Sequence, residues 1–204
     1  PYMERLAALD LDEIVNDNEL LNFSMAGGKA VFAENCAPCH GTGGSGNPGF
    51  PSLQDDDWLW GGSLETINET LHVGIRWDAN DDTRFNDMPA FGRDEILERD
   101  GINDVVQYVL SFNGRETDKA AAARGMEVFA DNCASCHGED AKGVQELGAP
   151  NLTDAIWLYG GDAAAITETV TNSRGGVMPA WGGRLDEETI KMLTVYVHSL
   201  GGGQ

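Results

Sequence analysis

The sequence predicts an all-α protein built from two tandem copies of one small helical domain. Short blocks of sequence recur along the chain in an unchanged order, which indicates an internal repeat. Apolar residues recur at intervals of three and four, and no stretch alternates as strands do. We therefore expect an N-terminal arm at 1–24, a first domain at 25–113, a linker at 114–118 and a second domain at 119–204.

Four blocks define the repeat. In the first copy they begin at Gly28, Cys36, Trp58 and Met88, and in the second copy at Gly125, Cys133, Trp157 and Met178. The offset is 97 residues at the cysteines (133 − 36) and 90 at the methionines (178 − 88). The first copy therefore carries an insertion, placed at about 77–87 when Arg76 is aligned with Arg174.

Each copy is expected to hold three helices separated by long loops. In the first copy they cover 27–35, the apolar positions 64, 67 and 71, and the apolar run from 102 to 109. In the second copy they cover 124–132, the positions 166 and 170, and the run from 190 to 200. Residues 1–24 have no counterpart in the second copy, and their Leu and Ile residues among acidic ones suggest a tether or an arm.

The chain is strongly acidic, with 34 Asp and Glu against 13 Lys and Arg and a formal net charge of −21. This charge argues against nucleic acid or anionic lipid as partners. It leaves two alternatives open, a basic protein partner or a solvated acidic surface. No apolar run reaches the roughly 18 residues that a membrane helix needs. Because the chain starts at Pro1, we expect a processed or truncated piece.

All four cysteines lie in two Cys-x-x-Cys-His motifs, the attachment signature of c-type haem. The signature predicts two covalent haem c groups, with Cys36 and Cys39 holding one, Cys133 and Cys136 the other, and His40 and His137 as axial iron ligands. Zinc ribbons instead pair two Cys-x-x-Cys motifs about 15–20 residues apart. Here the motifs are 97 residues apart (133 − 36), and a redox dithiol would not need the adjacent histidine.

The second axial ligand of an electron-transfer haem is commonly a methionine. Met88 and Met178 are equivalent in the repeat, each precedes Pro-Ala, and each lies just before the third helix of its copy. We expect each to bind the iron of its own copy. His72, in the second helix of the first copy, is the alternative iron ligand to Met88. The long loop before Met88 leaves this alternative open. Filled axial positions suit electron transfer rather than bond-making chemistry.

Three further equivalent pairs are expected around the haems. The carbonyls of Pro51 and Pro150 would accept the second N–H of the ligating histidines. The indole N–H groups of Trp58 and Trp157 could reach haem propionates, with core packing as the alternative. The guanidinium groups of Arg76 and Arg174 could pair with propionates or form surface salt bridges.

The motifs together resemble the di-haem subunit III of cbb3-type cytochrome c oxidases, the CcoP/FixP-like family. The resemblance is carried by the Cys motifs, by Trp58-Leu59-Trp60-Gly61-Gly62 and Trp157-Leu158-Tyr159-Gly160-Gly161, and by the two Met-Pro-Ala blocks. It implies class I cytochrome c domains with His/Met ligation, on the periplasmic side of the bacterial inner membrane. It also implies an N-terminal membrane anchor, which this chain lacks, so residues 1–23 would follow the missing anchor.

The same resemblance implies a role without catalysis by the subunit itself. Electrons would pass from a donor cytochrome c, expected to be basic, to membrane-embedded oxidase subunits that reduce dioxygen and pump protons. One alternative is a free periplasmic di-haem shuttle. A di-haem peroxidase is a further alternative, but it needs one five-coordinate haem, and the paired Met-Pro-Ala motifs argue against it.

Overall fold

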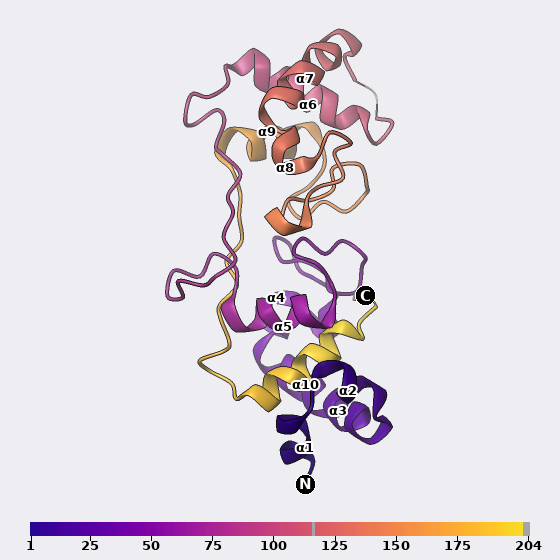
Figure 1. Cartoon of the computed structure of the whole chain (residues 1–204). Coiled ribbons are helices and arrows are strands. Elements are labelled where there is room, and N and C mark those ends of the chain that lie inside the picture. The colour runs from indigo at the N-terminus through magenta and orange to yellow at the C-terminus, as the bar shows by residue number, and fades with distance from the viewer. Residues whose placement is uncertain (116, 202–204) are drawn as a thin grey trace. The chain divides into compact units, whose positions relative to one another are not determined.

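The computed structural model describes residues 1–115 and 117–201 and contains helices joined by long loops (Figure 1). The helices are α1 Tyr2–Ala8, α2 Leu11–Asn16, α3 Asn18–Asn35, α4 Ala37–His40, η1 Thr42–Gly44, α5 Leu64–Val73, α6 Arg99–Ser111, α7 Lys119–Asn132, α8 Ala134–His137, η2 Gln145–Leu147, α9 Ala163–Asn172 and α10 Glu187–His198. Apart from isolated β-bridges, the described residues form no strand. The all-α prediction is confirmed.

Side-chain caps explain where most of the longer helices begin. Asp17, Ser63, Asp118, Asp162 and Asp186 each accept a hydrogen bond from a backbone N–H in the first turn of the helix that follows. Such caps satisfy N–H groups that lack an intrahelical partner, and each contributes about 1 kcal/mol. Helix α6 begins after Glu98 without a side-chain cap and is stabilised by the apolar face that it buries.

The chain forms two compact units that do not follow the order of the repeat. Unit 1 comprises residues 1–85 together with 176–204, and unit 2 comprises residues 86–175. This corrects the predicted consecutive domains at 25–113 and 119–204. The physical reason is the pairing of helices: α6 from the first copy packs on α7, and α10 from the second copy packs on α3. Each copy thus gives its last helix to the other.

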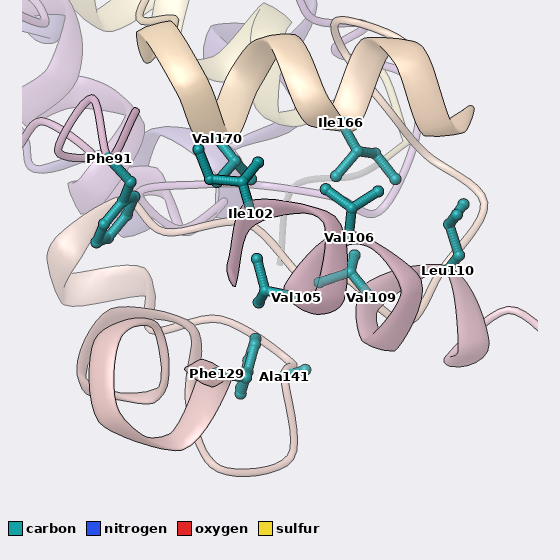
Figure 2. Close-up of a cluster of buried hydrophobic side chains, with 10 residues drawn as sticks. All are labelled: Phe91, Ile102, Val105, Val106, Val109, Leu110, Phe129, Ala141, Ile166 and Val170. Atoms are coloured by element: carbon teal, nitrogen blue, oxygen red, sulfur yellow. The ribbon is translucent and has the colours of Figure 1, made fainter. Parts of the chain in front are cut away.

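The core of unit 2 lies between α6, α7 and α9. Figure 2 shows the valines and Ile102 of α6 lying between Ile166 and Val170 of α9 and Phe129 of α7. Phe129 is also within ring-contact distance of Tyr108 and Phe112. Burial of these side chains removes apolar surface from water, which is the main stabilising contribution.

The core of unit 1 repeats this arrangement with α3, α5 and α10. Phe32, Leu71 and Leu193 are among its buried residues. A second apolar cluster covers the outer side of α10, where Leu6 and Ile14 of the N-terminal arm are fully buried. Residues 1–24 therefore form a folded part of unit 1, which favours the arm over the tether.

The predicted linker and the end of the predicted second domain include residues that the structure does not describe. The predicted linker at 114–118 includes residue 116, and the predicted second domain includes 202–204; these four residues lie outside the described ones. In the rest of the chain, no helix combines the length and the apolar character that crossing a membrane requires.

Candidate haem sites

The Cys motif of unit 1 forms one tight helical turn at the end of α3. The backbone N–H of Cys36 donates to the carbonyl of Phe32 at 2.9 Å, and that of His40 donates to the carbonyl of Cys36 at 2.8 Å. This turn brings the thiols of Cys36 and Cys39 and the imidazole of His40 into one short segment, α4 and its N-cap. Such spacing suits two thioether bonds and one axial ligand on a single porphyrin.

Unit 2 builds the same turn at the end of α7. The N–H of Cys133 donates to the carbonyl of Phe129 at 2.8 Å, and the N–H of His137 donates to the carbonyl of Cys133 at 2.9 Å. In both units the glycine after the histidine has positive φ, 76° at Gly41 and 78° at Gly138. A side chain is rarely tolerated in that conformation, so glycine lets the chain leave the turn at once.

Each histidine ring is oriented by a proline carbonyl. His40 Nδ1 lies 3.0 Å from the carbonyl oxygen of Pro51, and His137 Nδ1 lies 3.1 Å from that of Pro150. Burial lowers the pKa of both imidazoles, while these hydrogen bonds act in the opposite direction. A neutral ring that donates from Nδ1 leaves the Nε2 lone pair for a metal, as an axial ligand requires.

Burial raises the pKa of the first cysteine of each motif. Burial, with a smaller contribution from the neighbouring Cys39, raises the pKa of Cys36 to about 11. Burial and Cys136 raise the pKa of Cys133 to the same value. Reactive redox cysteines have lowered pKa values. Among residues 1–115 and 117–201, no group of three or more His, Cys, Asp and Glu side chains is arranged to hold a metal ion. The raised pKa values argue against a reactive redox dithiol and are compatible with thioether attachment.

The two methionines lie in the opposite units from those expected. Met178 packs against the cluster that contains Cys36, and Met88 packs against the cluster beside Cys133 and Phe129. This packing does not agree with the expected pairing of each methionine with the haem of its own copy. The cause is the exchange of the last helices, since each Met-Pro-Ala segment precedes the helix that is exchanged.

Backbone hydrogen bonds hold the segment that carries Met178. Met178 and Ile75 exchange N–H to carbonyl bonds of 2.9 Å in each direction, and Trp181 N–H donates to the carbonyl of Leu71 at 2.8 Å. In unit 2 the N–H groups of Gly92 and Arg93 donate to the carbonyl of Thr171 at 3.1 and 2.9 Å. The C-terminal end of α5 or α9 therefore anchors each methionine segment.

The Nε2 atom of His72 has a contact that an iron ligand would lose. Its Nδ1 lies 2.9 Å from the carbonyl oxygen of Asn68, and its Nε2 lies 2.8 Å from Oε2 of Glu187. The side chain links α5 to the first turn of α10. Both ring nitrogens are engaged, so the geometry does not favour His72 as a ligand.

The two tryptophan side chains form hydrogen bonds within the loops that follow the haem motifs. Trp58 Nε1 donates to the carbonyl of Asp55 at 3.0 Å, and Trp157 Nε1 donates to that of Asp154 at 3.2 Å. Both rings pack against the buried cluster of their unit. The contacts favour the core-packing alternative over the expected propionate partners.

The arginine pair needs a correction. Arg174 donates to the carbonyl of Ala165 at 2.7 Å and lies 4.9 Å from the Tyr159 ring. In unit 1 it is Arg84 that donates to the carbonyl of Thr66 at 3.4 Å and lies over the Trp60 ring at 5.4 Å. Arg84 is therefore the structural counterpart of Arg174.

Arg76, which the sequence alignment pairs with Arg174, has another environment. It donates from Nε to the carbonyl of Gly176 at 2.7 Å. The insertion in the first copy consequently ends before Arg84, so it overlaps the predicted segment 77–87 but does not include 84–87. The offset of 90 residues between the methionines, applied to Arg174, gives position 84 (174 − 90), so the sequence held this signal.

Each unit thus contains the same complete set of groups that could bind a haem. Two thiols, one oriented imidazole and one thioether belong to unit 1, and the same four groups belong to unit 2. These are the groups that attach a haem c and fill both axial positions of its iron. The residues present therefore fit this cofactor.

Comparison with known proteins agrees with this chemistry. A family model described as cytochrome c oxidase, cbb3-type, subunit III matches residues 120–197, and a cytochrome c model matches residues 25–113. The cbb3-type cytochrome c oxidase subunit FixP of Azorhizobium caulinodans is 57% identical over 201 residues, covering 98% of this chain and 68% of the relative. Subunit CcoP of Cereibacter sphaeroides is 53% identical, with coverage of 98% and 69%. Subunit CcoP of Azospirillum brasilense is 53% identical, with coverage of 100% and 71%.

Proposed function

Because the chain belongs to the family of subunit III of cbb3-type cytochrome c oxidases, electron-transfer subunits of an oxidoreductase, we propose that it carries two haem c groups and relays single electrons from a donor cytochrome c to the dioxygen-reducing core. The periplasmic side of the membrane is the proposed location. The observation that carries the proposal is the presence of one complete donor set in each unit.

Bound haem c supplies one chemical property, an iron that cycles between the ferric and ferrous states. The chain's own residues would attach and orient it. Thioether bonds from Cys36 and Cys39 would fix the ring to α4. The carbonyl of Pro51 fixes the plane of His40. An imidazole and a thioether that filled both axial positions would leave no position open to dioxygen, so the proposed role of the subunit is electron transfer without a bond-making step.

The exchange of the last helices indicates which histidine and which methionine bind the same iron. We infer that His40 and Met178 serve the haem of unit 1, and that His137 and Met88 serve the haem of unit 2. The support is the packing of each methionine with the buried cluster of that unit. A methionine thioether favours ferrous iron and raises the potential of both haems.

The number of haems is tested by acid–acetone extraction and mass spectrometry of the purified protein. All haem should remain on the polypeptide, with the mass of two haem groups. Haem released into the acetone phase, or a mass corresponding to one haem, would contradict the proposal.

The axial pairs are tested in chains that carry a single haem. In the background Cys133→Ala with Cys136→Ala, only the haem of unit 1 remains. There Met178→Ala should abolish the sulfur–iron absorption band, and Met88→Ala should leave it. The background Cys36→Ala with Cys39→Ala should give the reverse result. The opposite assignment in either background would restore pairing within each copy.

The relay itself is tested with oxidase complexes that lack this subunit. Adding the membrane-anchored, haem-loaded form should restore oxygen consumption driven by a reduced donor cytochrome c. The matched control adds the variant in which Cys36 and Cys39 are alanine. Equal oxygen consumption with both forms would show that the haem of unit 1 lies outside the electron path.

A further inference from the structure

The helix pairs of the two units can be compared residue by residue. A Cβ added at Gly125 would meet Asp104 and Tyr108, and one added at Gly28 would meet Met192 and Tyr196. The crossings therefore share one register, in which position 104 corresponds to 192 and 108 to 196, an offset of 88 residues (192 − 104). Positions that differ within this register can distinguish the two pairings.

In unit 2 the crossing carries a charged pair. Arg124 Nε donates to Oδ2 of Asp104 at 2.7 Å, and Arg124 Nη2 donates to Oδ1 at 2.6 Å. The Asp104 side chain is only 9% exposed, whereas that of Arg124 is 62% exposed. The two hydrogen bonds give a buried carboxylate its partner, and they hold the pKa of Asp104 below its usual value.

In unit 1 the same two positions are apolar and complementary in size. Gly27 corresponds to Arg124, and Met192 corresponds to Asp104. A Cβ added at Gly27 would lie 2.5 Å from Sδ of Met192, so the thioether fills the space that a side chain at 27 would need. Each helix pair is therefore matched within itself and mismatched with the other.

The N-terminal arm adds a second, independent difference. Met192 and Val195 are buried with Leu6 and Ile14 of the arm. Lys191 Nζ donates to the carbonyls of Leu6 and Leu9 at 3.0 and 2.7 Å.

The corresponding residues of α6 are suited to a face without an arm. Asn103 is exposed, Gln107 is half-buried, and Oε1 of Gln107 accepts from the backbone N–H of Asp118 at 2.9 Å. Packed on α3, these residues and Asp104 would lie under the apolar arm.

We propose that these positions form a pairing code, defined as residues 27, 124, 104, 107, 192 and 195, which selects the exchanged helix pairs over the consecutive ones. In a consecutive arrangement, Asp104 would face Gly27 and lose its cation, and Met192 would face Arg124. A buried carboxylate without a partner is strongly unfavourable. The code thereby decides which methionine reaches which histidine. That consequence rests on the proposed ligation, whereas the pairing itself does not.

A photocrosslinker at the C-terminal end of α6 can show whether this helix packs on α7 or on α3. The ring of Phe112 lies 5.7 Å from that of Phe129 on α7. Benzoylphenylalanine at position 112 of the full, haem-loaded chain should therefore crosslink to 119–132. In a consecutive arrangement it would reach Phe32 instead, and adducts would fall in 18–35. Peptide mass spectrometry gives the ratio of the two adducts, independently of haem spectra or electron transfer.

Two variants make the two crossings symmetric at positions 27, 124, 104 and 192, and leave positions 107 and 195 unchanged. Asp104→Met with Arg124→Gly gives both crossings the apolar pair, and Gly27→Arg with Met192→Asp gives both the charged pair. Each should lower the ratio of α7 to α3 adducts at least tenfold. The control Asp104→Arg with Arg124→Asp keeps a charged pair in unit 2 and should keep the wild-type ratio.

The outcomes against the proposal are equally definite. An unchanged ratio in the symmetric variants would show that these residues do not select the pairing. Failure of both symmetric variants to fold, while the control folds, also counts against it, because each symmetric pair copies one that the molecule already contains.

Discussion

A methyl group added to Gly125 tests the packing of α6 on α7. The new Cβ would meet the carbonyl oxygen of Asp104 first, and it would lie 2.5 Å from the carbonyl carbon of Asp104 and 2.9 Å from Cβ of Tyr108. An ordinary contact begins at 3.4 Å, so the helices must separate by at least about 0.9 Å (3.4 − 2.5). A gap of roughly this size forfeits about a quarter to a half of each contact energy across the interface.

The magnitude follows from two opposing effects. Overpacking costs about 1–3 kcal/mol, and the upper end applies because a backbone carbonyl cannot rotate away. Alanine gains about 1 kcal/mol over glycine within a helix. The net loss is about 2 kcal/mol, which lowers the melting temperature by about 8–16 °C for a unit of this size.

The assay is thermal unfolding of the haem-loaded chain, followed by circular dichroism. Gly101→Ala in α6 is the matched control, because the nearest atom to its added Cβ is Leu97 Cδ2 at 3.8 Å. It should gain up to about 1 kcal/mol. If Gly125→Ala raised the melting temperature as Gly101→Ala does, the close α6–α7 contact would be refuted.

Three further predictions follow from the charges and histidines. The guanidinium of Arg124 holds the pKa of Asp104 below its ordinary value of 3.8. The contribution of this carboxylate to stability is therefore present above pH 3.8 and is lost as the pH falls through the lowered pKa. Asp104→Asn should be less stable than wild type at pH 7, and denaturant titrations should show this difference shrinking towards pH 3. His72→Ala should retain the full sulfur–iron absorption band, and loss of the band would reinstate that histidine as a ligand. Reduction by a basic cytochrome c should slow steeply between 0.01 and 0.1 M salt, as the Debye length falls from about 30 to 10 Å; Asp78→Asn with Asp81→Asn should weaken this dependence in stopped-flow experiments, and a rate independent of salt would show that the acidic surface does not attract the donor.

The donor groups of the sites could be identified from the sequence because their chemistry is local. Two cysteines and a histidine within five residues define a haem attachment, and Pro51 and Pro150 follow at a distance that lets the carbonyl reach the ring. Local spacing also predicted α5, α6, α9 and α10. These features depend on segments short enough for one pattern to cover them.

The exchange of helices could not be read from the repeat, since two equivalent copies offer each last helix two equivalent partners. Only the differences between the copies break this symmetry, above all Arg124 and Asp104 against Gly27 and Met192. Arg84 was missed for another reason. The order of the blocks aligns Arg76 with Arg174. The insertion, however, shifts the alignment by nine residues (99 − 90) between the Trp and Met blocks, so Arg84 is the residue that corresponds to Arg174.

Unit 2 is a continuous stretch, residues 86–175, whereas unit 1 begins before it and ends after it. During synthesis from the N-terminus, the first cysteine pair emerges early, but α10 and Met178 emerge last. The second unit can thus close while the first still waits for its final helix. A chain that stops at residue 175 would hold every cysteine and only one complete donor set. With the axial pairs proposed above, the donor set of unit 2 would be complete first, although its attachment motif is made second.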